Sequence, residues 1–316
     1  MDVQYLNTEE IRKDFFFCFT STMHSETLEK SVQLSGIRTP MQVVERKKGY
    51  QLLSGFKRFY AARKAGLRQI PVQIINESVA ADTFFQTVAE QLTIRHLTLL
   101  EKARVLQILD KLKEDGDRIR PAFLSLLELS NQKAVLKTLS ALPELDKKVQ
   151  AYIELYNLSE KQCRTLTKLS EDEQKLLMGP AFKLQIRAVE LLEMIGTLLD
   201  IAGRESHSVL KVYKTLKIDR ILMRSELTRN EKIAAIHQIL QQARYPRMQM
   251  WSKKLDELNK KLKVSAGITF TWDRTLEKSG LICRMQIGSV EDVLKAATGF
   301  SDEQNLRTIQ KMLDIV

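Results

Sequence analysis

Two cations directly after a glycine turn could bind an anion. Lys57 and Arg58 follow Gly55 at the start of a segment, residues 57–65, that we expect to be helical. The first turn of a helix has free backbone N–H groups and a partial positive charge, which attracts anions and disfavours cations. Two cations in this turn therefore predict a bound anion such as phosphate.

Residues 36–70 carry most of the positive charge of the chain. They hold nine basic side chains and one acid, Glu45, in a chain of 316 residues whose formal net charge is +11. The cations are Arg38, Arg46, Lys47, Lys48, Lys57, Arg58, Arg63, Lys64 and Arg68. Such a run is often a solvated surface, and that interpretation stays open. Because this run spans a strand, a glycine turn and a helix start, we favour a polyanionic partner.

The residues up to about 80 read as a small mixed domain with the order helix, strand, strand, helix, strand. Ser25 can cap a first helix that Gly36 ends. Two strands, 41–45 and 49–53, follow. The helix 57–65 then leads to a strand that we expect Pro71 to open.

Residues 81–202 read as helices. The S/T-x-x-E/Q capping box, which satisfies two helix-end donors reciprocally, predicts helix starts at Thr98, Ser159 and Ser170. Prolines are expected to mark further boundaries, with one longer helix from Pro180 to about residue 202. The prolines concerned are Pro121, Pro143 and Pro180.

The last third reads as a separate α-β-β-α unit after a linker at residues 203–208. Thr228 starts a helix that Pro246 interrupts, and a basic helix then runs to about residue 263. Two alternating segments, ITFTW and LICRMQI, predict paired strands, and two helices close the chain. We expect Ser301 to cap the last helix in a capping box with Gln304.

The fold class is therefore α+β, with three expected domains: 1–80, 81–202 and 203–316. A helix-turn-helix is expected between residues 121 and 142, with AFLSLLEL as its first helix and NQKAVLKTLSAL as its second. Amide and lysine side chains at the second helix can pair with base edges or phosphates. These are Asn131, Gln132, Lys133 and Lys137. The turn lacks the usual glycine, so a purely structural helix pair is an open alternative.

A second basic stretch, residues 244–263, holds seven cations against two acids. Contact with a phosphate backbone and charge at a dimer face would both explain it. The three cysteines lie far apart without a CxxC pair, which argues against a disulfide framework or a zinc site and fits the cytoplasm. No apolar run is long enough to predict a membrane span.

Three blocks of sequence resemble the ParB family of chromosome and plasmid partition proteins, in order and with few gaps over residues 1–178. They are LEKSVQLSGIRTPMQVVERKKGYQLLSGFKRFYAARKAGLRQIPVQII, AEQLTIRHLTLLEKARVLQIL and ALPELDKKVQAYIELYNLSEKQCRTLTKLSEDEQ. The resemblance implies a ParB/sulfiredoxin-like domain that binds CTP, followed by a helical DNA-binding domain. In that family, nucleotide binding closes a dimer clamp around DNA.

Carried over residue by residue, the resemblance implies a base pocket and a phosphate site. The base pocket would be formed by Gly36, Thr39 and Pro40. Phosphates would be held by Gly55, Lys57 and Arg58, with Arg95 completing the positive charge. Glu90 would lie near the γ-phosphate as the catalytic carboxylate, and Gln91 would help to hold Mg²⁺.

Two departures put hydrolysis in doubt. Phe56 replaces the glutamate of the family's G-E-R-R turn, and Gln91 replaces an asparagine. In the similar sulfiredoxins a reactive cysteine occupies this glycine turn, but here the position is again Phe56. A weak CTPase activity is therefore left open.

Three functions follow as hypotheses. The favoured one is a ParB-like DNA-binding protein, acting in partition or transcription regulation, dimeric through residues after about 205 and associated with the nucleoid. A partition ATPase is a candidate partner, and no membrane is expected. The second is a nucleotide-dependent enzyme, a CTP or ATP hydrolase or phosphotransferase, on the same N-terminal fold. The third is an adaptor that has lost both ligands.

Overall fold

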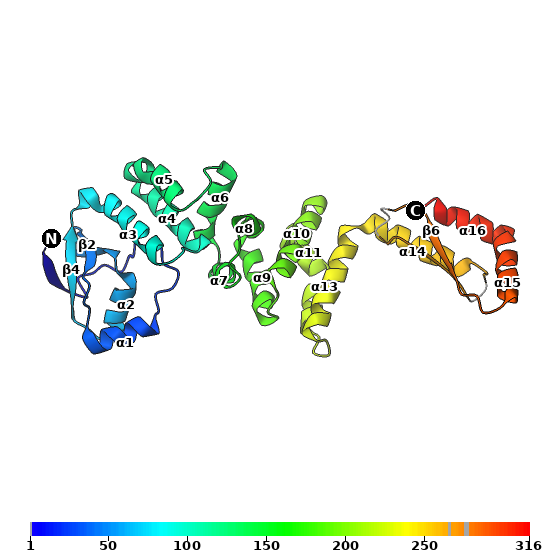
Figure 1. Ribbon diagram of the computed structural model, residues 1–316, viewed down its shortest axis with the longest axis horizontal. Helices are drawn as coiled ribbons and strands as arrows, with labels where there is room; N and C mark the ends of the chain where they lie inside the picture. Colours follow the sequence, from blue (N-terminus) through cyan, green and yellow to red (C-terminus); the bar gives the residue numbers. More distant parts are fainter. Residues whose placement is uncertain (1, 265–266, 275–277) are drawn as a thin grey trace. The chain divides into compact units, whose positions relative to one another are not determined.

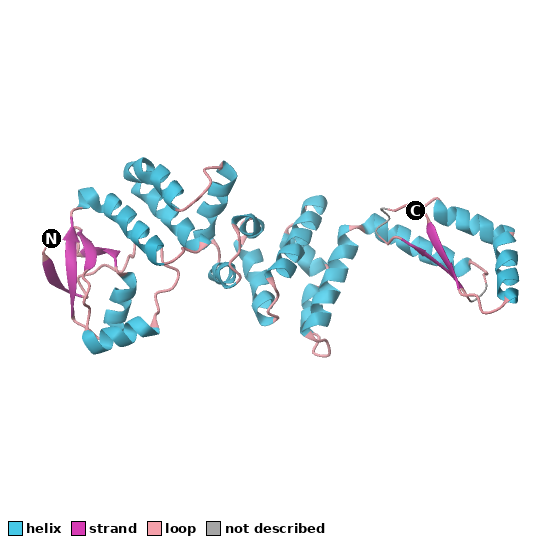
Figure 2. Cartoon of the chain, viewed as in Figure 1, coloured by secondary structure: helices cyan, strands magenta, loops and turns pink. Residues whose placement is uncertain are grey.

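The computed structural model describes residues 2–264, 267–274 and 278–316 (Figure 1). It is a mixed α+β protein, as the sequence predicted, with two small sheets and many helices (Figure 2). Contacts divide the chain into two compact units, residues 1–196 and 197–316, which we describe separately. The finer division at residue 80 stays a prediction.

The first unit begins with a four-stranded sheet in the order β1-β4-β2-β3. Its strands are β1 (Val3–Asn7), β2 (Met41–Glu45), β3 (Tyr50–Ser54) and β4 (Gln69–Ile75). Strand β4 is antiparallel to β1 and parallel to β2, and β2 is antiparallel to β3. Val43 and Val72, on the two inner strands, are fully buried.

The sequence interpretation did not include strand β1. Its side chains Val3 and Tyr5 are 52% and 67% exposed, so this edge strand carries no buried alternating pattern. The last strand also starts before Pro71 rather than at it. Pro71 pairs with Tyr5 of the edge strand within β4.

Helices cover this sheet, and an aromatic core continues from it into the helical region. Helix α1 (Glu26–Ser35) packs against α2 (Phe56–Lys64), and α3 (Ala80–Ile94) packs against β3. The rings of Phe17 and Phe123 both contact that of Phe84, with centroids 5.6 Å apart in each pair. This shared core explains why residues 1–196 form one unit.

The helical part of this unit has the capping boxes that the sequence predicted, at Thr98, Ser159 and Ser170. A short helix η1 (Glu77–Val79) precedes α3, and η2 (Leu142–Glu144) follows α6. The other helices are α4 (Leu99–Leu112), α5 (Glu114–Leu126), α6 (Lys133–Ala141), α7 (Lys147–Leu155), α8 (Glu160–Leu166), α9 (Glu171–Lys183) and α10 (Ala188–Glu205).

Two expected proline boundaries are wrong. Pro121 lies inside α5 and Pro180 inside α9, so no single helix runs from Pro180 to residue 202. The break comes at Gln185, which has the left-handed φ of 47°. The amide of Gln185 donates to the carbonyl of Phe182 and that of Ile186 to Ala181, which is a Schellman motif without glycine.

The second unit holds a helical part and a small α/β part. Its elements are α11 (Val209–Thr215), α12 (Ile218–Met223), α13 (Arg229–Arg244), α14 (Pro246–Lys261), β5 (Ile268–Trp272), β6 (Leu281–Met285), α15 (Val290–Ser301) and α16 (Glu303–Leu313). Strands β5 and β6 are antiparallel, as expected. Leu255, Phe270, Trp272 and Met312 form the core with two smaller neighbours.

Two details of this unit differ from the sequence interpretation. Ser301 is the last residue of α15, and Asp302 caps α16 by accepting from the amide of Asn305. Helix α10 also continues into the expected linker as far as Glu205. Among the described residues, no helix is long and apolar enough to cross a membrane.

Candidate anion-binding site

The turn that opens α2 requires glycine. Gly55 has φ 91° and ψ 24°, the left-handed region that favours a residue without a side chain. A Cβ at this position would lie 2.6 Å from Cγ of Met41, which is too close. Gly55 has no side chain to cap this helix, and no hydrogen bond among the described residues uses the backbone amides of Phe56, Lys57 and Arg58, so these N–H groups are available to a ligand.

Arg58 is fixed beside this turn by two backbone carbonyls. Its Nη1 donates to the carbonyl oxygens of Thr39, at 2.5 Å, and Pro40, at 3.1 Å. In the described chain its Nε and Nη2 make no hydrogen bond, so donors of the guanidinium stay available. Burial lowers the pKa of Arg58, but guanidinium groups stay protonated in proteins.

The structure therefore brings together several of the expected site residues. Thr39 and Pro40, from the proposed base pocket, contact Arg58 from the proposed phosphate site. Lys57, in the same helical turn, is half-buried and makes no ion pair with any described residue. Gly36 ends α1 with φ 69°, three residues before Thr39 in the chain.

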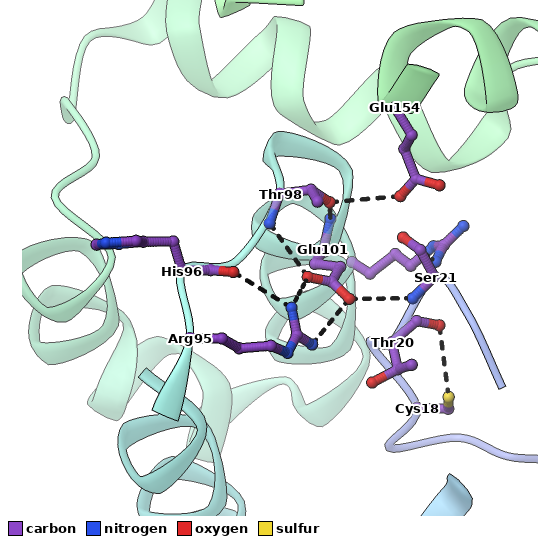
Figure 3. A network of polar contacts seen from close by, with 9 residues as sticks. Cys18, Thr20, Ser21, Arg95, His96, Thr98, Glu101 and Glu154 are labelled. Atoms are coloured by element: carbon purple, nitrogen blue, oxygen red, sulfur yellow. Dashed lines mark hydrogen bonds and ion pairs between the residues drawn. The ribbon is translucent and has the colours of Figure 1, made fainter. Parts of the chain in front are cut away.

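Arg95 lies elsewhere, in a polar network at the joint between α3 and α4 (Figure 3). Its Nη1 and Nη2 donate to the two carboxylate oxygens of Glu101, at 2.6 and 2.9 Å. The same carboxylate accepts from the backbone amides of Thr98 and Ser21, at 3.1 and 3.2 Å. No hydrogen bond in the described chain joins Arg95 to the Gly55 turn.

Glu101 is the residue of this network that the sequence interpretation missed. Its side chain is 4% exposed. Burial raises its pKa, but the hydrogen bonds from Arg95, Thr98 and Ser21 outweigh burial and hold it below its ordinary value. The Thr98–Glu101 capping box marked this carboxylate as a helix cap, but local sequence could not show that it also binds Arg95.

The two residues expected to serve catalysis and Mg²⁺ stand apart from these groups. Glu90 is exposed and Gln91 half-exposed on α3, and neither side chain makes a hydrogen bond in the described part of the chain. The described residues include no cluster of three or more His, Cys, Asp or Glu that could hold a metal ion. Phe56 is buried, with its ring 5.8 Å from that of Phe15.

The expected DNA-reading residues lie at the exposed start of α6. Asn131 and Gln132 precede the helix, Lys133 begins it and Lys137 follows one turn later, and all four are exposed. With Arg120 of α5, three of these residues line a groove of about 490 Å³ between α4, α5 and α6.

The turn before α6 forms without the glycine that is usual in a helix-turn-helix. Glu128 takes the left-handed conformation with φ 54°. The amide of Leu129 donates to the carbonyl of Leu124, and that of Glu128 to Ser125, so a second Schellman motif ends α5. A non-glycine residue therefore makes the turn between these two helices.

Comparison with known proteins identifies the part of the chain that holds the Gly55 turn. Residues 2–88 match the ParB N-terminal domain. This match assigns residues 2–88, and with them the Gly55 turn, to the ParB N-terminal domain family. It is 32% identical over 130 residues to a probable plasmid-partitioning protein ParB of Xylella fastidiosa (strain 9a5c). That match covers 37% of this chain and 32% of the relative, about a third of its length.

Solved ParB structures also resemble this chain. A C-terminally truncated Caulobacter crescentus ParB complexed with CTP-γ-S is 19% identical, with a TM-score of 0.26 over 54% of this chain and 94% of that one. The same protein complexed to the centromeric parS site is 16% identical, with a TM-score of 0.30 over 61% and 98%. A Pnob8-like ParB-N domain is 15% identical, with a TM-score of 0.34 over 61% and 88%.

Proposed function

We propose that this protein is a ParB-like DNA-binding protein that acts in plasmid or chromosome partition, and that CTP binding at its N-terminal domain gates its hold on DNA. The observation that carries the proposal is the Gly55 turn. Within a ParB N-terminal domain, a left-handed glycine opens a helix whose first turn holds Lys57 and the anchored Arg58.

The chemistry of this turn suits a triphosphate. Free N–H groups at the start of α2 and two cations can share the charge of several phosphate oxygens. A guanidinium presents two parallel N–H donors to a phosphate, whereas Lys57 supplies a mobile point charge. The segment with Gly36, Thr39 and Pro40, tied to Arg58 through its carbonyls, is the proposed site of the cytosine base.

The proposed role in DNA binding rests on α6. Its exposed start presents two amides and two lysines, which suit base edges and phosphates in a major groove. In this proposal the protein is a homodimer through residues after about 205, binds a partition ATPase and associates with the nucleoid.

The proposed function includes nucleotide binding but not nucleotide hydrolysis. Glu90 would orient a water and Gln91 would help to hold Mg²⁺, but Phe56 leaves the turn without the family's carboxylate. No observation in the structure favours a dedicated CTP or ATP hydrolase over a nucleotide-gated DNA-binding protein.

Calorimetric titration of the full chain with CTP, ATP, GTP and UTP, each with and without duplex DNA, tests this function. We expect saturable binding of CTP, weaker binding of the purine nucleotides, and a CTP affinity that changes when DNA is present. Because coupling between two ligands is reciprocal, CTP must change DNA affinity by the same factor. Absence of binding by all four nucleotides would contradict the proposal.

A further inference from the structure

Helix α2 is flanked by two grooves with different charge balance. The first, about 260 Å³ in volume, lies between α1 and α2 and includes His24, Glu29, Lys30 and Lys64. The second, about 460 Å³ in volume, lies between α2 and the segments that flank β1 and β4. Its lining includes Thr8, Glu9, Lys13, Phe59, Arg63 and Arg68.

The first groove pairs two of its three basic side chains with one acid. Lys64 donates to Glu29 Oε2 at 2.6 Å, and His24 Nδ1 lies 2.5 Å from Glu29 Oε1. These contacts lower the pKa of Glu29, the hydrogen bond from Lys64 being the largest cause. Lys64, at the end of α2, is therefore paired with an acid inside the protein.

The second groove leaves its cations unpaired. Lys13, Arg63 and Arg68 make no ion pair with any residue that the structure describes, and Glu9 is the one acid in the lining. The guanidinium of Arg63 lies 5.9 Å from the ring centroid of buried Phe59, which holds it over the groove. Three unpaired, exposed cations beside one exposed acid give this groove a positive potential that attracts anions.

The backbone of this groove is well defined by hydrogen bonds. After α2, the amide of Gly66 donates to the carbonyl of Arg63 and that of Leu67 to Ala62, with Gly66 at φ 71°. The amide of Thr8 then donates to the carbonyl of Arg68 at 2.9 Å. The cations therefore project from a fixed turn and not from a long loop.

This groove is separate from the Gly55 turn. Gly55 precedes α2, whereas Arg63 and Arg68 lie at or beyond its other end, and a nine-residue helix is roughly 13 Å long. Within the basic run, Lys57 and Arg58 therefore lie at the start of α2, whereas Arg63 and Arg68 lie at or beyond its end. A single nucleotide bound at Gly55 would leave the second group of cations unneutralised.

We infer that this second groove binds the phosphodiester backbone of DNA without reading its sequence. The inference rests on the proposed DNA-binding function. An open groove with exposed cations and little polar specificity suits a repeating row of phosphates, and such contacts position a protein without reading bases. DNA is favoured over an acidic protein because the apolar lining residues Ile11 and Phe59 are buried and Leu67 is only partly exposed, so that a ligand in the groove meets mainly cations.

The salt dependence of DNA binding tests this inference. Binding of the full chain to a fluorescein-labelled duplex of about 40 base pairs is measured by fluorescence anisotropy between roughly 50 and 200 mM salt. Arg63→Gln combined with Arg68→Gln should reduce the slope of log K against log salt by about 1.8, because each lost phosphate contact removes about 0.9. Lys13 lies between β1 and α1, outside α2, and Lys13→Gln should reduce the slope by about 0.9.

The matched control is Lys64→Gln combined with Arg118→Gln, which removes two exposed cations that are paired with Glu29 and Asp82. We expect this control to change the slope by less than about half as much.

If wild-type protein binds DNA and the slope of the test variants equals that of the control, the groove is not a DNA site. If wild-type protein binds no duplex at all, the proposed function itself fails, and the inference fails with it. Binding of polyglutamate that is lost in the test variants, with an unchanged DNA slope, would assign the groove to an acidic protein instead.

Discussion

Arg95 and Glu101 form a two-pronged ion pair across the joint between α3 and α4, with N–O distances of 2.6 and 2.9 Å. The backbone amide of Ser21 donates to the same carboxylate, so three segments of the first unit meet at one nearly buried group. Arg95 is therefore occupied within the protein.

Glu101→Gln should destabilise the first unit by about 2 kcal/mol, because partly exposed Arg95 loses its counter-charge and the nearly buried side chain loses charge-assisted hydrogen bonds. Urea denaturation followed by circular dichroism measures this loss. The control is Asp82→Asn, which removes an exposed pair with Arg118 between α3 and α5 and should cost less than about 1 kcal/mol. Equal midpoints for the two variants would show that the Glu101 network contributes little.

The contribution of Glu101 should depend on pH. Its pKa in the folded protein lies below the ordinary value of 4.5, as hydrogen bonds outweigh burial. A carboxyl group whose pKa is lowered by folding stabilises the protein above its unfolded pKa, and that stabilisation disappears as the pH falls through the folded pKa. The difference in unfolding free energy between wild type and Glu101→Gln should therefore be largest near neutral pH and shrink in acid. A difference that grows on acidification would contradict this sign.

Gly55→Ala should both destabilise the protein and weaken nucleotide binding. The added Cβ would meet Met41 at 2.6 Å in a left-handed conformation, which should cost more than about 1 kcal/mol. Gly179→Ala is the control, because Gly179 lies inside α9 with open space around its Cβ, and it should be neutral or stabilising. Thermal unfolding of both variants measures the difference. A Gly55→Ala protein as stable as wild type would show that the turn does not need glycine.

Asn131→Ala should reduce discrimination between DNA sequences without changing the salt slope. If Asn131 reads a base edge, its loss should cost about 1–3 kcal/mol against the preferred base pair. Selection of bound duplexes from a random pool, followed by anisotropy on the selected and a shuffled duplex, gives this ratio. An unchanged ratio would place Asn131 outside the reading surface, and α6 would then be a structural helix.

The sequence predicted the elements whose signals are local. The glycine before α2, the strands around residues 41–54 and the Thr98 capping box each carry their own pattern, and each was found. The helix end at Gln185 was not recognised because a left-handed residue without glycine has no local signature. The end of α5 was expected at residue 129 and lies at Leu126. Pro121 and Pro180 lie inside helices, where their local preference predicted a helix end.

The sequence predicted only the part of the site that lies within one continuous stretch of the chain. The turn with Gly55, Lys57 and Arg58 is recognisable from neighbouring residues. The carbonyls of Thr39 and Pro40 that hold Arg58 lie 19 and 18 residues away, and Glu101 joins Ser21 across 80 residues. Such pairings depend on how the sheet and α3 pack, which spacing along the chain does not encode.

The most direct test of the account is calorimetric titration of CTP into wild-type protein and Lys57→Gln. Lys57 makes no ion pair in the described chain, so its substitution should leave the unfolding midpoint unchanged and act on the ligand alone. We predict about a tenfold loss of CTP affinity, equivalent to about 1.4 kcal/mol, for one lost charge-assisted contact. Identical CTP affinity in the two proteins would show that no phosphate is held at the Gly55 turn.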